Sequence, residues 1–299
     1  LSKNLYEIIK HMPKKSHPMD VARTAVSVMG LEDKETQDST PEANMRKALR
    51  IFAKTPTALA AFYRIRKGKK IIKPKKSLTF AENFFYMCFG KVPQKEIVKA
   101  FDVSLILYAE HSFNVSTFTA RTITSSLSDI HGAITGAIAS LKGPLHGGAN
   151  EEVMHMMNKI KKPENALKWI NNALKNKEVV MGFGHRVYKS GDSRVPTMRQ
   201  YFGKVAKLKK DKKFEKIYDI VEKVMIKEKN IHPNVDYPTG PTYHLMGFDT
   251  DFFTPIFVIS RITGWSAHIM EQHAANKLIR PLASYKGSKH RKVLELNQR

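Results

Sequence analysis

Cysteine is almost absent from this sequence, and its scarcity narrows the kind of protein that the chain can form. The 299 residues include a single cysteine, Cys88. One cysteine cannot form a disulfide within the chain, and it cannot build a metal site that needs several thiolates. We therefore expect a protein of a reducing compartment, the cytoplasm.

Long apolar runs are also missing. No stretch approaches the roughly 20 apolar residues that a helix needs to span a bilayer, so we expect no membrane partner. No signal peptide is visible, but the chain begins at Leu1 rather than at methionine, so we expect the natural start to lie upstream and leave targeting open. The apolar fraction of 42% is typical of folded proteins, and 299 residues suffice for one large domain or two unequal ones.

Acidic residues are scarce relative to basic ones. The chain has 27 Asp and Glu residues against 51 Lys and Arg residues, a net charge of +24. Three explanations fit this excess: lysines on solvated helix faces, attraction of small polyanionic substrates such as coenzyme A or dicarboxylates, and nucleic-acid binding. No basic–aromatic RNA-binding motif or zinc-finger pattern is present, so we expect no nucleic-acid partner.

Strand-like alternation is scarce too, whereas helical periodicity is abundant, and we predict an all-α protein. Apolar residues recur at helical spacing in three stripes: Phe214, Ile217, Tyr218, Val221, Val224 and Met225; Leu167, Ile170 and Leu174; and Val153, Met156, Met157 and Ile160. The basic segment from Arg66 to Lys76 predicts a loop or linker. Near the C-terminus, we expect a helical segment to end at Arg280-Pro281.

The first candidate site is the segment "GPLHGGAN", which places His146 between a Gly-Pro turn and the pair Gly147-Gly148. Glycines allow the backbone to approach a ligand closely. A helix is expected to follow, and the positive end of its dipole disfavours a protonated imidazole. A neutral His146 can donate a hydrogen bond to an oxygen that gains negative charge. The alternative is a histidine that only caps or packs at the turn.

A second histidine, His185, follows Gly182-Phe183-Gly184. These glycines expose backbone groups, and a nearby cationic cluster could bind phosphates or carboxylates. The cluster comprises Arg186, Lys189 and Arg194. A dinucleotide-binding fingerprint is excluded, because its third glycine and flanking strands are missing. The alternative is a basic surface loop.

Three more residues could contribute to a site. Asp236 lies in a predicted loop between two proline-bearing turns, where rigid flanks suit a general base, although such a carboxylate is usually a turn residue or a cap. His111 ends an apolar stripe, which fits a core histidine. Arg261 lies inside an apolar helical run, where a buried charge is costly unless it is paired, so it suggests an anionic partner.

Taken together, these motifs resemble the citrate synthase family. The resemblance rests on "GPLHGGANE", "GFGHRVYKSGDSR", "HPNVDYPTG" and "FTPIFVISRITGWSAHIMEQ" followed by "KLIRPLASY", in the family's order and at family-like spacing from about Asn4 onward. The family's N-terminal segment is not part of this sequence, in agreement with a start upstream. The resemblance implies an all-helical homodimer whose large and small domains enclose a cleft. We expect the small domain at residues 148–250 and the large domain at residues 1–147 and 251–299.

The resemblance also assigns roles, position by position. The catalytic trio is matched by His146, His185 and Asp236. The groups that hold oxaloacetate are matched by His111, Arg194 and Arg261, together with Arg280, which the family contributes from the partner subunit. The coenzyme A side of the cleft is matched by Val180, Gly182, Gly184 and Lys189.

The implied reaction is a Claisen-type condensation of an acyl-CoA with the ketone of oxaloacetate, followed by thioester hydrolysis. Asp236 would remove a proton from the carbon next to the thioester. Two oxygens then gain charge, and His146 and His185 would each donate a hydrogen bond to one of them. We expect no metal and no cofactor, since the acyl-CoA is a substrate and no ligand spacing for a metal is visible.

One departure from the family's wording bears on the acyl group. Many members read Asp-Pro-Arg where this chain reads Asp192-Ser193-Arg194. This stretch, with "DYPTGPTYHLMGFDT", is closer to members that make 2-methylcitrate from propionyl-CoA. We therefore expect propionyl-CoA, acetyl-CoA or both as substrates. The alternatives are an enzyme that uses acetyl-CoA only and a non-catalytic basic paralogue that acts as a binding protein; the complete trio argues against the latter.

Overall fold

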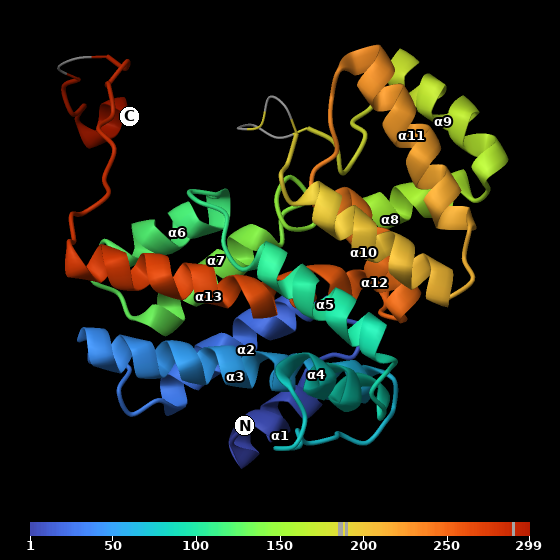
Figure 1. Ribbon diagram of the computed structural model, residues 1–299. Helices are drawn as coiled ribbons and strands as arrows, with labels where there is room; N and C mark the ends of the chain where they lie inside the picture. Colours follow the sequence, from blue (N-terminus) through green and yellow to red (C-terminus); the bar gives the residue numbers. More distant parts are fainter. Residues whose placement is uncertain (185–187, 189–190, 289–290) are drawn as a thin grey trace.

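The computed structural model describes residues 1–184, 188, 191–288 and 291–299, and within them it is built from α-helices (Figure 1). The helices are α1 (Lys3–His11), α2 (Pro18–Glu32), α3 (Pro41–Arg66), α4 (Phe80–Phe89), α5 (Lys95–Tyr108), α6 (Val115–Thr124), α7 (Ile130–Leu141), α8 (Ala149–Ile160), α9 (Pro163–Lys175), α10 (Val195–Leu208), α11 (Lys213–Lys229), α12 (Asp236–Met246) and α13 (Phe253–Ala274). Two short 3-10 helices are η1 (Thr250–Phe252) and η2 (Leu296–Gln298). The described residues contain no strand, only an isolated bridge between Phe183 and Pro233. The predicted all-α fold is confirmed.

Local sequence explains where several helices begin. The side chains of Thr40, Asn114 and Asp129 accept hydrogen bonds from the first backbone N–H groups of α3, α6 and α7. Thr79 and Glu82 form a reciprocal capping box at the start of α4. Proline occupies the first turn of α2, α3, α9 and α10, where no backbone donor is needed.

Helix α13 is the centre of the larger helical group, which consists of α1 to α7 and α13. It packs against α3, α5, α6 and α7, and its Trp265 is fully buried. Gly264 lets α13 approach the end of α5, because a Cβ there would lie only 2.5 Å from the carbonyl oxygen of Ala109. The two helices can therefore share hydrogen bonds near this point.

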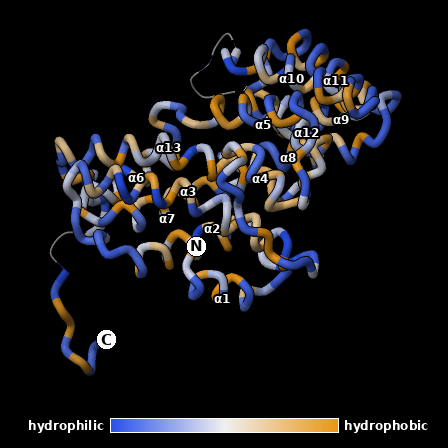
Figure 2. The backbone as a smooth tube through the Cα atoms, turned by 60° about the horizontal axis from the view of Figure 1, so that its bottom comes forward, coloured by the Kyte–Doolittle hydropathy of each residue, from blue (hydrophilic) through white to orange (hydrophobic). Residues whose placement is uncertain are grey.

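Helices α8 to α12 gather on one side of the molecule (Figure 1). Helix α12 packs on α8 and α10, while α10 also contacts α5 from the larger group. Figure 2 shows hydrophobic and hydrophilic residues mixed along these helices. The predicted domain boundaries at 148 and 250 stay a prediction.

Most residues of the predicted apolar stripes are buried in the core of this second group. Buried members are Val153, Met156, Met157, Ile160, Ile170, Phe214, Ile217, Tyr218, Val221 and Met225. Leu167 is an exception, since 54% of it is exposed on α9. The loop predicted at Arg66–Lys76 begins where α3 ends at Arg66.

The C-terminal segment differs from the prediction. Helix α13 ends at Ala274, and the described residues from Ala275 to Glu295 contain no helix, so the helical segment expected to reach Arg280-Pro281 was wrong. The tail leaves the end of α13 and runs away from the body in both views (Figures 1 and 2). Leu278, Leu282 and Tyr285 are exposed, so their apolar character does not reflect packing within this chain. In the part of the chain that the structure describes, no helix combines the length and apolarity needed to cross a membrane.

Candidate active site

An arginine enclosed by protein lies at the centre of the candidate site. Arg261, on α13, is only 1% exposed, and its Nε donates to the carbonyl oxygen of Tyr108 at 2.7 Å. Its guanidinium lies over the ring of Phe257, 4.6 Å from the ring centre. Its Nη1 is buried and has no hydrogen-bond partner among the described residues. A buried cation with an unused donor suits an anionic ligand.

The charge of Arg261 survives this burial. Removal from water lowers the pKa of the guanidinium to about 10, with a further contribution from the nearby Arg194. A group with that pKa is still protonated at neutral pH. The side chain therefore supplies a positive charge inside an apolar helix.

Asp236 is the first residue of α12 rather than a loop residue, which corrects our sequence interpretation. Pro238 fits the first turn of this helix, whereas Pro233 precedes it. The hydroxyl of Tyr108 donates to Oδ1 of Asp236 at 2.5 Å. Burial raises the pKa of Asp236 to about 6, although the bond from Tyr108 and the charge of Arg194 act in the opposite direction. A carboxylate with this pKa is ionised at neutral pH and more basic than an exposed one.

An ion pair ties Arg194 to the backbone that precedes Asp236. Asp192, 4% exposed, accepts from Nε of Arg194 at 3.0 Å and from its Nη2 at 2.8 Å. It also accepts from the backbone N–H of Val235 at 3.0 Å. Burial by itself favours protonated Asp192, but the bonds from Arg194 outweigh it and leave the pKa lowered. Nη1 of Arg194 donates to the carbonyl oxygen of Leu107 at 3.3 Å, so the pair joins α5, α10 and α12.

The hydrogen bonds of His146 define its tautomer. Its Nε2 lies 3.2 Å from the backbone nitrogen of Ser116 and 2.8 Å from the Ser116 hydroxyl. A backbone N–H can only donate, so Nε2 is the acceptor and the proton of the neutral ring is on Nδ1. The indole N–H of Trp265 donates to the same hydroxyl at 3.1 Å, which fixes Ser116 in turn.

Burial is the largest cause of this neutral state. Burial lowers the pKa of His146 to about 4, and the positive charges of Arg261 and His111 lower it further. These causes act in the same direction as the helix dipole that the sequence suggested, since α8 begins three residues later at Ala149. This effect on the pKa of His146 also means that His111 and Arg261 lie close enough to His146 to interact with it electrostatically.

Two of the glycines singled out in the sequence face protein rather than open space. A Cβ on Gly147 would lie 2.5 Å from the side chain of Leu141 and 2.6 Å from its carbonyl oxygen. A Cβ on Gly182 would lie 2.7 Å from Val153 and 2.8 Å from Tyr237. These glycines therefore permit tight internal packing on the side where a Cβ would lie, and the expected approach of their backbone to a ligand stays a prediction.

The loop that carries His185 is anchored beside the segment that leads to Asp236. The backbone N–H of Gly184 donates to the carbonyl oxygen of His232 at 2.9 Å, and the Asn234 side chain donates to the carbonyl oxygen of Gly184 at 3.0 Å. The loop returns at Gly191, which also lies near His232. His185 and Lys189 themselves lie outside the described residues.

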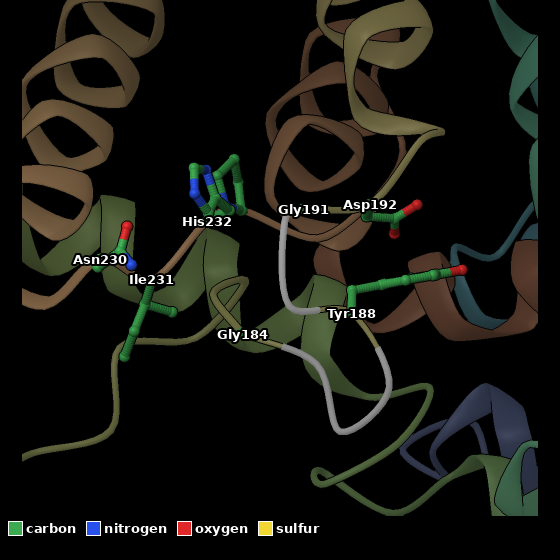
Figure 3. Close-up of a pocket in the computed structure, with 8 residues that line it drawn as sticks. Gly184, Tyr188, Gly191, Asp192, Asn230, Ile231 and His232 are labelled. Carbon is green, nitrogen blue, oxygen red and sulfur yellow. The ribbon is translucent and has the colours of Figure 1, made fainter.

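Two cavities adjoin this loop. One, of about 270 Å³, is drawn in Figure 3 and is lined by Gly184, Tyr188, Gly191, Asp192, Asn230, Ile231, His232 and Pro233. The other, of about 300 Å³, shares Gly184 and Ile231 with the first and includes Val180 and Phe183. The Tyr188 hydroxyl lies 3.0 Å from Nε2 of His111, which connects the first cavity to the group around Arg261.

In the part of the chain that the structure describes, Arg280 makes no hydrogen bond or ion pair with the residues around Arg261 and Asp236. It is exposed and follows the end of α13. The tail leaves α13 at the end opposite to α10 and α12 (Figure 1). The sequence interpretation also missed residues that organise the site, namely Tyr108, Ser116, Asp192 and Trp265. Tyr108 was only weakly indicated by the sequence, as an aromatic residue three positions before His111. Among the described residues, no three His, Cys, Asp or Glu side chains cluster so that they could hold a metal ion.

Comparisons with known proteins give a consistent result. The sequence profile of the family described as "Citrate synthase, C-terminal domain" matches residues 1–282. The chain is 51% identical to a citrate synthase of Mycolicibacterium smegmatis, over 98% of this chain and 78% of that protein. It is also 51% identical to a 2-methylcitrate synthase of Mycobacterium tuberculosis, over 97% of this chain and 74% of that protein. The solved structure of a Thermoplasma acidophilum citrate synthase with carboxymethyl coenzyme A and oxaloacetate is similar at a TM-score of 0.92 and 33% identity, covering 100% of this chain and 80% of that one.

The state of His146 can be tested by NMR. In a ¹⁵N-labelled sample, we expect its ring to give the pattern of the neutral Nδ1–H tautomer at neutral pH and to titrate with a midpoint near 4, because burial and the neighbouring cations disfavour its protonated form. The spectrum of His146→Asn would assign the signals. A midpoint close to 6.5, or the Nε2–H pattern, would contradict the hydrogen bonding described above.

Proposed function

Since this chain belongs to the citrate synthase family, we propose that it condenses an acyl-CoA with oxaloacetate and hydrolyses the resulting thioester, releasing coenzyme A and citrate or 2-methylcitrate. The observation that carries this proposal is the convergence of three groups. Arg261 offers a buried unused donor, Asp236 is a carboxylate of raised pKa, and His146 is a neutral imidazole. Arg261 suits the binding of an anionic acceptor, Asp236 suits the removal of a proton from carbon, and His146 suits donation to an oxygen that gains negative charge.

Oxaloacetate carries two carboxylates beside its ketone, so its site must supply positive charge. Arg261 can bind one carboxylate through Nη1, because Nε is already bonded to Tyr108. Arg194 and His111 lie near this group and would provide further donors. Bound in the low-dielectric interior, these charges act more strongly than they would in water.

The first chemical step is removal of a proton from the carbon next to the thioester. Asp236 is the proposed base, and its raised pKa makes it a stronger base than an ordinary carboxylate. As the proton leaves, negative charge develops on the thioester oxygen. Nδ1–H of His146 would donate to that oxygen, since Nε2 is occupied by Ser116. One donor of this kind supplies on the order of 3–4 kcal/mol of transition-state stabilisation.

The second step joins the new carbon nucleophile to the ketone of oxaloacetate, whose oxygen becomes an alkoxide. His185 is the proposed donor to this oxygen, by its match to the family's motif. Support comes from the flanks of its loop, because Gly184 and Gly191 both lie beside His232, four residues before Asp236. Hydrolysis of the thioester then releases the product and coenzyme A.

Coenzyme A is proposed to bind beside the cavities next to this loop. Val180 and Gly184 line the larger of the two, and Lys189 belongs to the same loop by sequence. Gly182 would contribute by shaping the turn rather than by contact, since its free side packs on Val153 and Tyr237. The net charge of +24 would favour the approach of a polyanionic substrate.

A homodimer is also part of the proposal, with Arg280 completing the site of the partner subunit. Support comes from the tail, which is exposed and carries apolar side chains without packing partners in this chain, including Leu278, Leu282 and Tyr285. A free buried thiol at Cys88 agrees with the cytoplasm as the proposed compartment. No cofactor is proposed.

An enzyme restricted to acetyl-CoA is the alternative. Overall similarity does not decide between the two acyl groups, because relatives named for citrate and for 2-methylcitrate are equally identical to this chain at 51%. The local sequence around Asp192 and Tyr237 favours acceptance of propionyl-CoA. A non-catalytic binding paralogue has less support, since such a protein has no use for a basic carboxylate beside a buried arginine.

The role of Asp236 can be tested by replacing it with asparagine. We expect Asp236→Asn to lower kcat by about 10²- to 10⁴-fold, because the amide cannot accept the substrate proton. Oxaloacetate binding, measured by calorimetry, should stay close to that of the wild type, since the cationic groups are untouched. Unchanged turnover would remove Asp236 from the mechanism.

The choice of acyl group can be tested in a competition assay. With acetyl-CoA and propionyl-CoA present together and oxaloacetate limiting, we expect at least as much 2-methylcitrate as citrate when products are separated by mass. A pocket with room for the extra methyl gains about 0.8 kcal/mol per buried CH₂. A ratio of citrate to 2-methylcitrate above about ten would favour the acetyl-CoA enzyme instead.

The shared site can be tested by mixing inactive subunits. Arg280→Ala and His146→Ala proteins should each be inactive alone. After subunit exchange, we expect activity to return to at most about a quarter of the wild-type value, because half of the dimers are mixed and each has one intact site. Demonstrated exchange without any activity would refute a contribution of Arg280 in trans.

A further inference from the structure

Tyr108 occupies an unusual place between the two charged groups of the site. It is the last residue of α5, and only 1% of it is exposed. Its hydroxyl donates to Oδ1 of Asp236 at 2.5 Å, while its carbonyl oxygen accepts from Nε of Arg261 at 2.7 Å. Its ring centre lies 4.0 Å from that of Phe257, which also lies beneath the guanidinium of Arg261. One residue thus contacts both the base and the buried cation.

We propose that Tyr108 is a positioning residue that keeps the Asp236 carboxylate ionised and fixes it relative to Arg261. The inference rests on the proposed function, in which Asp236 is the base and Arg261 binds oxaloacetate. The hydroxyl occupies Oδ1, and in the described part of the chain no hydrogen bond reaches Oδ2. Oδ2 is therefore the oxygen left to accept the substrate proton.

The charges around Asp236 do not make this hydrogen bond redundant. The groups that face the carboxylate include Tyr108 from α5, Asp192 and Arg194 from the segment before α10, and Arg261 from α13. Tyr243, on the same helix as Asp236, also interacts with it electrostatically. Much of the positive charge of Arg194 is offset by its own ion pair with Asp192. Tyr108 makes the one hydrogen bond to the Asp236 carboxylate that the described residues contain. Loss of its hydroxyl should therefore favour the protonated carboxyl.

The chain offers a matched control in Tyr243. This tyrosine lies on α12, is fully buried and bonds through its hydroxyl to Oγ of Ser104 at 2.9 Å. Ser104 is one helical turn before Tyr108 on α5. Tyr108→Phe and Tyr243→Phe therefore each remove one buried hydroxyl from the interface between α5 and α12, but only the first touches Asp236.

The first experiment compares pH profiles of kcat/KM. In Tyr108→Phe, we expect the acid limb to move upward by about one to two pH units, because a hydrogen bond to a charged group is lost. Activity should fall about tenfold or more near the wild-type midpoint and recover at higher pH. The limb of Tyr243→Phe should not move. A loss of activity in Tyr108→Phe that is equal at every pH would overturn the proposal and leave a merely structural role.

The second experiment does not depend on catalysis. Aspartates labelled with ¹³C at the carboxyl carbon are titrated by NMR in the wild type and in both tyrosine variants, and Asp236→Asn assigns the signal. We expect the Asp236 midpoint to rise in Tyr108→Phe and to stay unchanged in Tyr243→Phe. If the wild type shows no condensation yet this shift occurs, the proposed function fails and the positioning role stands. An unshifted midpoint in an active, folded Tyr108→Phe protein overturns the proposal.

Discussion

The enclosure of one positive charge in an apolar helix is the constraint on which the rest of the site depends. Removing a guanidinium from water costs several kcal/mol unless its donors are satisfied. Arg261 meets part of this requirement through the carbonyl oxygen of Tyr108 and the ring of Phe257, and it leaves Nη1 for an anion. Close packing makes this possible, because Gly264 lets α13 lie against the end of α5. The site is thus already arranged for a negative ligand before one arrives.

Burial acts on the base and on the imidazole in opposite directions, and both shifts suit the chemistry. It raises the pKa of Asp236 to about 6 and lowers that of His146 to about 4. Both shifts disfavour the charged form, so each costs folding stability in the pH range where the group is charged. For Asp236, the free energy of unfolding is highest below the unfolded pKa, where the carboxyl is protonated, and it falls as the pH rises through 6. For His146, the free energy of unfolding is highest above the unfolded pKa, where the imidazole is neutral, and it falls as the pH falls through 4.

The candidate site is held by contacts between helices that are distant in the sequence. Tyr108 connects α5 to α12 and α13, and Asp192 connects the start of α10 to the residue before Asp236. Ser116 holds His146 from α6, and Trp265 of α13 holds Ser116. Asp236, His146 and Arg261 are therefore each held by a polar neighbour from a distant part of the chain. Movement between the two helical groups would change the site as a unit.

The sequence by itself determined the helical architecture and the residue types of the site. Apolar spacing predicted the core faces of α8 and α11, because helical periodicity is a local property of the chain. The motifs around His146, Asp236 and Arg261 indicated the family, since each is a short continuous segment. These features required no knowledge of how the helices pack.

Only the tertiary structure decided how those residues are held and charged. The pKa values of Asp236 and His146 depend on burial by several helices, and the sequence did not reveal burial as the main cause of the neutral state of His146. Gly147 and Gly182 were expected to let a ligand approach, and only the structure shows that protein atoms fill the space where a Cβ would lie. Tyr108 and Asp192 were overlooked because their partners are 128 and 43 residues away along the chain. Desolvation and long-range hydrogen bonds arise only when distant segments meet, so local pattern could not reveal them.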